Sequence, residues 1–98
     1  MRLPLLRVVR SGHETIVVIC DSKLLGKKFR KKKLKLEVKE HFYCGRDASV
    51  KECLEALEAA TIANLVGSIV DEAVKAGMLD KNCVIRFKGA PHAQLVKM

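Results

Sequence analysis

An apolar stretch from residue 49 to residue 77 constrains the fold of this chain more than any other feature. Its apolar side chains recur every three or four positions, which places them on one face of an α-helix. Ser49 and Glu52 form a Ser-x-x-Glu capping box, which marks where the helical stretch begins. Gly77 follows the last apolar turn, at the place where a left-handed residue commonly ends a helix. Everything outside this stretch has the pattern of short strands and turns.

The apolar face changes direction within the stretch, so one straight helix does not fit it. Counted at 100° per residue, the positions of Leu57 and Val66 differ by about 180° around the helix axis. We therefore expect a break around residues 61–64, with helices over residues 50–60 and 65–76. Asn64 or Ser68 is expected to cap the second helix.

Five segments are predicted to be strands: residues 1–9, 15–20, 33–39, 82–88 and 93–97. Residues 15–20 are β-branched or apolar on both faces, which indicates a central strand. Residues 33–39 alternate strictly between apolar and charged side chains, which is typical of a half-buried strand with a basic outer face. Residues 41–44 either extend that strand or begin a turn at residues 45–47. Residues 89–92 are expected to form a hairpin loop.

These elements predict a single α+β domain over residues 1–98. We expect a two-layer sandwich, in which a mainly antiparallel sheet carries two helices on one face. The opposite face would then carry a set of exposed basic side chains, namely Lys33, Lys35, Lys39, Arg86 and Lys88.

The composition favours a soluble intracellular protein, and we expect a cytoplasmic location without a membrane. No apolar run approaches the roughly 18 residues of a membrane span, and the start of the chain lacks a signal-peptide pattern. Four cysteines without a CxxC pair are expected to be free thiols. Three side-chain amides against 13 lysines and six arginines hint at a thermophile.

Charge is divided unevenly along the chain and indicates an acidic partner. Residues 47–80 hold seven acidic and two basic residues, a net charge of −5, whereas the rest of the chain carries +13. Six of the seven residues 27–33 are basic, so we expect a loop or hairpin tip there. Phe29 lies inside this run and Phe42 and Tyr43 lie nearby, so base stacking is conceivable. The candidate RNA-binding residues are Lys27, Lys28, Arg30, Lys31, Lys32, Lys33, Lys35, Arg86 and Lys88. The alternative is a solvated, lysine-rich surface that serves solubility, since charge alone carries no specificity.

A second set of residues could line a pocket: His41, Cys44, Asn64, Gly67 and His92. His41 and Cys44 are three apart, but a zinc site usually needs two such close pairs, so neither a metal nor a cofactor is predicted. Cys44 with either histidine is the one candidate for a nucleophile and its base. Residues 64–68 could direct a helix N-terminus at an anion or could simply join two helices.

Four segments together resemble an archaeal family, domain-of-unknown-function family 424, along essentially the whole chain. They are CDSKLLGKKF (residues 20–29), HFYCG (41–45), NLVGSIVDEAV (64–74) and KGAPHAQLVKM (88–98). The resemblance implies an archaeal, cytoplasmic α+β protein and suggests a link to translation or RNA. It brings no catalytic residues with it.

Three functions follow as hypotheses. The first is a non-enzymatic protein that binds RNA or another acidic partner through its basic residues. The second is an assembly module that forms a homo-oligomer. The third is a small enzyme or metal site near His41, Cys44 and His92.

Overall fold

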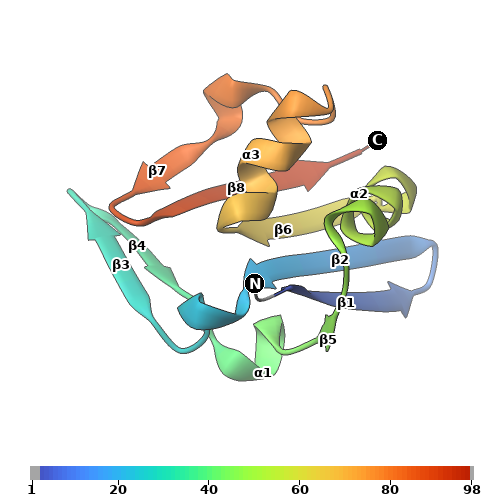
Figure 1. Ribbon diagram of the computed structural model, residues 1–98, viewed down its shortest axis with the longest axis horizontal. Coiled ribbons are helices and arrows are strands. Elements are labelled where there is room, and N and C mark those ends of the chain that lie inside the picture. The colour runs from blue at the N-terminus through green and yellow to red at the C-terminus, as the bar shows by residue number, and fades with distance from the viewer. Residues whose placement is uncertain (1–2, 98) are drawn as a thin grey trace.

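The computed structural model describes residues 3–97 as a six-stranded sheet with a layer packed on each face (Figure 1). Helices α2 and α3 cover one face, and a two-stranded hairpin with the short helix α1 covers part of the other. Along the chain, the elements are β1 (Pro4–Ser11), β2 (Glu14–Asp21), the 3₁₀-turn η1 (Ser22–Leu24), β3 (Lys28–Lys31), β4 (Leu34–Glu37), α1 (Glu40–Tyr43), β5 (Arg46–Asp47), α2 (Val50–Ala59), β6 (Ile62–Val66), α3 (Ser68–Lys75), the 3₁₀-turn η2 (Lys81–Cys83), β7 (Ile85–Phe87) and β8 (Ala90–Val96).

The six strands lie in the order β5-β1-β2-β6-β8-β7, and every neighbouring pair is antiparallel except β2 and β6. The predicted central strand is β2. Its Val17 and Ile19 face the helices, while Val18 and Cys20 face the opposite layer. The predicted α+β fold with a mainly antiparallel sheet and two helices on one face is confirmed, and the hairpin adds a partial third layer.

The break in the helical stretch is a strand rather than a loop, which corrects the prediction. Residues 62–66 form β6 between β2 and β8, so the second helix begins at Ser68 and not at residue 65. Leu65 faces α2 and α3, whereas Val66 faces the other layer. A five-residue segment that is apolar except for Asn64 and mostly buried cannot be distinguished from helix by its spacing alone.

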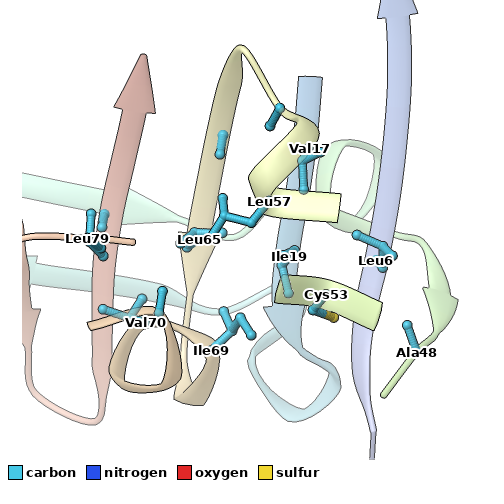
Figure 2. Packing of buried hydrophobic residues seen from close by; sticks show 14 residues of the cluster. Leu6, Val17, Ile19, Ala48, Cys53, Leu57, Leu65, Ile69, Val70 and Leu79 are labelled. Atoms are coloured by element: carbon cyan, nitrogen blue, oxygen red, sulfur yellow. The ribbon is translucent and has the colours of Figure 1, made fainter. Parts of the chain in front are cut away.

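Helix α2 begins and packs as its sequence predicts. Ser49 Oγ accepts a hydrogen bond from Glu52 N at 3.1 Å, and Glu52 Oε1 accepts one from Ser49 N at 3.3 Å, which is the capping box. Figure 2 shows Leu57 of α2 directed at Leu65 of β6, with Cys53 of α2 beside Ile19 of β2. Gly77 follows α3 with a φ of +74°, the left-handed conformation expected there.

The basic segment forms a hairpin that packs on the far face of the sheet. Phe29 and Leu36 are cross-strand partners; Leu36 belongs to a second buried cluster with Val18 and Phe87, and the half-buried Phe29 packs against that cluster. The basic side chains that alternate with Phe29 and Leu36, namely Lys28, Arg30 and Lys35, therefore lie on the outer side of this hairpin. The prediction that Lys33, Lys35 and Lys39 lie on the main sheet was wrong. Their predicted strand belongs to a separate two-stranded sheet, and its Leu36, together with Val38, is buried.

Three smaller predictions were also wrong. Residues 41–44 extend no strand and begin no turn, because His41 lies in α1, and residues 46–47 pair with β1. The strand predicted over residues 82–88 is limited to β7, because η2 precedes it. His92 lies inside β8 rather than in a loop. Pro91 has no N–H to donate, but its carbonyl oxygen accepts a hydrogen bond from Gly67 N at 2.9 Å.

Between residues 3 and 97, no helix is long and apolar enough to cross a membrane.

Candidate functional site

The β3–β4 hairpin concentrates cations that form no ion pair within 4.0 Å with any described residue, although Glu37 of β4 is the cross-strand partner of Lys28. We call its seven cations the basic hairpin: Lys27, Lys28, Arg30, Lys31, Lys32, Lys33 and Lys35. All seven are exposed. In the described chain the ion pairs within 4.0 Å are Arg46–Glu52 and Arg86–Asp71, and neither involves the basic hairpin. Arg30 and Lys35 are cross-strand partners on the outer side, so two like charges stand side by side there.

The tip of the basic hairpin adopts a conformation that lysine rarely takes. Lys32 and Lys33 form the turn between the paired Lys31 and Leu34, and Lys32 has a φ of +55°. Left-handed backbone costs an L-residue about 1–2 kcal/mol, and glycine or asparagine usually occupies such positions. The tip thus combines backbone strain with charge repulsion.

A groove of about 380 Å³ lies between the hairpin, α1 and the uncovered part of the sheet. We call it the sheet groove. Its charged, polar and aromatic lining comes from five segments: Lys35, Glu37, Lys39, Phe42, Tyr43, Asn64, His92 and Gln94. The register explains the cluster, because Asn64 pairs with Gln94 and Val66 pairs with His92 across β6 and β8. The structure therefore places the predicted Asn64 and His92 in one groove with Lys35.

Hydrogen bonds fix the orientation of the groove's polar groups. Gln94 Nε2 donates to Asn64 Oδ1 at 2.8 Å. His92 Nδ1 lies 3.0 Å from the carbonyl oxygen of Leu65, and since a carbonyl only accepts, Nδ1 carries the proton. Burial lowers the pKa of His92, which favours the neutral ring and leaves Nε2 as a hydrogen-bond acceptor.

One aromatic ring at the groove is accessible. Phe42 is 39% exposed and packs edge-on against Tyr43, with 5.1 Å between ring centroids and an interplanar angle of 83°. Arg7 Nη1 donates to the carbonyl oxygens of His41 and Phe42 at 2.6 and 3.2 Å, which ties α1 to β1. The sheet therefore holds Phe42 in place.

The other predicted pocket residues lie elsewhere. His41 and Cys44 are exposed and do not line the sheet groove. Gly67 is buried with a φ of +102°, and a Cβ there would collide with the carboxylate of Asp21. That carboxylate accepts from Ser68 N at 2.9 Å and from Ser68 Oγ at 2.7 Å. The N-terminus of α3 thus already holds an anion supplied by the chain itself.

Arg86 and Lys88 differ in their relation to the basic hairpin. Arg86 Nη2 lies 2.9 Å from Asp71 Oδ1 of α3, so it turns toward the helix layer. Its prediction on the same face as the lysines was wrong. Lys88 is exposed in the β7–β8 turn, at the same end of the molecule as the hairpin tip, and β3 packs beside β7 (Figure 1).

Cysteine chemistry finds little support in this geometry. Burial raises the pKa of Cys20 to about 12 and that of Cys53 to about 11, so both thiols stay protonated. Within residues 3–97, no hydrogen bond joins Cys44 to His41 or His92. Across the same residues, no three His, Cys, Asp or Glu side chains are grouped so that they could hold a metal ion.

The sequence prediction placed Lys39 on the basic face and Phe42 and Tyr43 near the basic run, but it did not bring them together with Gln94 in one site. One local signal was present: His92 and Gln94 are two apart, so they share a face if they lie in a strand. The expected loop at residues 89–92 concealed that relationship. The contribution of α1 depends on the tertiary fold.

Comparison with known proteins gives a family and a fold. The family described as "Protein of unknown function (DUF424)" matches residues 9–98. A crystal structure of an uncharacterized conserved protein from Methanopyrus kandleri is similar, with a TM-score of 0.75 and 23% sequence identity, over 97% of this chain and 93% of that one. No curated protein shows significant similarity to the chain.

Proposed function

We propose that this chain, which belongs to the DUF424 family, binds single-stranded RNA through its basic hairpin. The observation that carries the proposal is the set of seven exposed cations that form no ion pair within 4.0 Å among residues 3–97. Phosphates attract such cations, and release of the RNA's counterions drives association.

The strain at the hairpin tip supports a functional role for these cations. Lys32 holds a left-handed conformation in the middle of like charges, although glycine would relieve the strain and remove one charge. Features that oppose local stability are typical of functional sites. A surface that serves solubility needs charge, but it does not need lysine at this position.

Side-chain spacing on the basic hairpin suits an extended chain of phosphates. Lys28 and Arg30 lie on the same side of β3, about 6.8 Å apart along the strand, and Lys35 lies opposite Arg30 on β4. Successive phosphates of a stretched single strand are separated by a similar step. The acidic side chains of α2 and α3 lie across the sheet, so the field of the protein directs a polyanion to the hairpin side.

The binding test is fluorescence anisotropy of a labelled 12-nucleotide single-stranded RNA and a matching duplex between 50 and 200 mM salt. We expect a log–log slope of about −3 to −5 for the single strand, because each phosphate contact contributes about −0.7 and seven cations are available. Charge reversal at Lys31, Lys32 and Lys33 to Glu should abolish binding without loss of the folded state.

A matched variant controls for net charge. Lys51, Lys75 and Lys81 lie away from the hairpin, and their reversal to Glu changes the net charge of the protein by the same amount. Binding that persists in the hairpin variant, or that falls equally in both variants, would refute the assignment. If the duplex bound more tightly than the single strand, the proposed ligand would be double-stranded RNA instead.

A second candidate is an assembly module, and the charge layout favours it specifically. The acidic residues of α2 and α3 complement the basic hairpin of a neighbouring copy. In addition, β5 pairs only with Leu5 and Leu6, so within the described chain residues 7–11 of β1 keep an open edge. A salt-stable dimer by light scattering, without nucleic acid present, would favour this candidate.

A further inference from the structure

We infer that the sheet groove holds one unstacked base of the bound strand and prefers adenine. This inference rests on the proposed RNA binding and adds a sequence preference to it. Lys35 connects the two regions, because it belongs to the basic hairpin and also lines the sheet groove. A strand whose phosphates follow the hairpin therefore passes the mouth of the groove.

Phe42 gives the groove a stacking surface. Phe42 is exposed at the groove. The neighbouring Tyr43 is buried, and its edge-on contact holds the Phe42 ring in place. Aromatic rings hold unstacked bases in single-stranded nucleic acids, and a purine covers more of such a ring than a pyrimidine does. The groove volume of about 380 Å³ falls within the range of small-molecule sites.

The hydrogen-bonding groups of the groove favour a base with an amino group next to a ring nitrogen. With Nδ1 donating to Leu65, His92 presents an acceptor at Nε2, and no other described group bonds to it. Gln94 donates to Asn64, which leaves Gln94 Oε1 as an acceptor and Asn64 Nδ2 as a donor.

Adenine fits both the stacking surface and the hydrogen-bonding groups of the groove. Its N6 amine can donate to His92 Nε2 or Gln94 Oε1, and its ring nitrogen can accept from Asn64 Nδ2. Guanine carries O6 and uracil carries O4 at the position of the adenine amine, so neither base can donate from there to His92 Nε2 or Gln94 Oε1. Cytosine carries an amine but stacks over a smaller area.

The experiment compares labelled A12, C12, U12 and abasic 12-mers at one salt concentration by fluorescence anisotropy. We expect A12 to bind about tenfold more tightly than U12, with C12 between them, since a good amide–base contact discriminates by about this factor. The double variant His92→Ala/Gln94→Ala takes away both acceptors and should remove the preference while the affinity for the abasic strand stays unchanged. Phe42→Ala should weaken binding of A12 by about tenfold.

Asn82→Ala is the matched control, because Asn82 is an exposed amide in η2 that does not line the groove. Equal affinities for the four strands, or a preference that survives in the double variant His92→Ala/Gln94→Ala, would overturn the base pocket and leave the hairpin proposal intact. Failure of all four strands to bind at low salt would overturn both.

Discussion

Replacing Leu36 tests whether the basic hairpin is anchored on the sheet. Leu36 is 9% exposed within the second buried cluster, whereas Leu34, two residues earlier on the same side of β4, is 50% exposed. The two leucines share residue type, strand and side, so they differ mainly in burial. Leu36→Ala removes apolar contacts from the cluster and leaves a cavity, but Leu34→Ala removes few contacts.

The magnitudes follow from this difference in burial. A buried Leu→Ala substitution costs about 2–5 kcal/mol, and the position of Leu36 at the rim of its cluster places it near the lower end, at about 2–3 kcal/mol. For a chain of this size each kcal/mol lowers the melting temperature by about 4–8 °C, so we expect a decrease of about 10–20 °C. Leu34→Ala should cost less than about 1 kcal/mol.

Thermal unfolding followed by circular dichroism measures both variants, and hydrogen exchange locates the effect. Amides of β3 and β4 should exchange faster in Leu36→Ala than in the unsubstituted protein. The ratio of the protection factors of β2 to those of β6 should stay unchanged. Equal melting temperatures for the two variants would refute the packing of the hairpin on the sheet. RNA affinity should fall in Leu36→Ala because the cations lose their fixed spacing.

Three further outcomes are expected. Lys32→Gly should stabilise the protein by about 0.5–1 kcal/mol in urea unfolding, because glycine avoids most of the left-handed strain, and should reduce the salt slope of binding by about 0.7. At pH 8 a thiol reagent should modify the two exposed cysteines quickly and reach Cys20 and Cys53 only after denaturation, since their pKa values are about 12 and 11; four fast thiols would contradict the buried positions. Because burial lowers the pKa of His92, the unfolded chain binds the proton first, and stability should fall as the pH drops from about 6.5 toward that lowered value; His92→Gln should flatten this part of the pH profile.

Local sequence signals predicted the elements that depend on neighbouring residues. The capping box at Ser49, the left-handed Gly77 and the doubly apolar β2 each involve contacts within a few residues or a uniform pattern, so they can be recognised directly. Strand β6 escaped this reasoning because its five residues sit between two helices with similar apolar content. Its identity depends on β2 and β8, which are distant in sequence.

One part of the candidate site could also be predicted from neighbouring residues, and the other part could not. The density of cations at residues 27–33 is visible in the sequence, and it predicted a hairpin tip. The sheet groove is not visible, because Phe42 and Gln94 meet only after α1 and β8 reach the same face of the sheet. Arg86 was misassigned because its ion pair with Asp71 depends on where α3 lies.

The parallel pairing of β2 with β6 sets the order in which this chain can complete its folding. Thr15 N donates to Thr61 Oγ1 where the two strands begin, across 46 positions of sequence. The β1–β2 and β3–β4 hairpins involve close neighbours and can form within about 1–10 μs, but closing so long a loop slows the final step. During synthesis, the inner edge of β2 therefore has no partner from its own sheet until residue 62 and those after it leave the ribosome. Until then this apolar strand remains open to pairing with other chains.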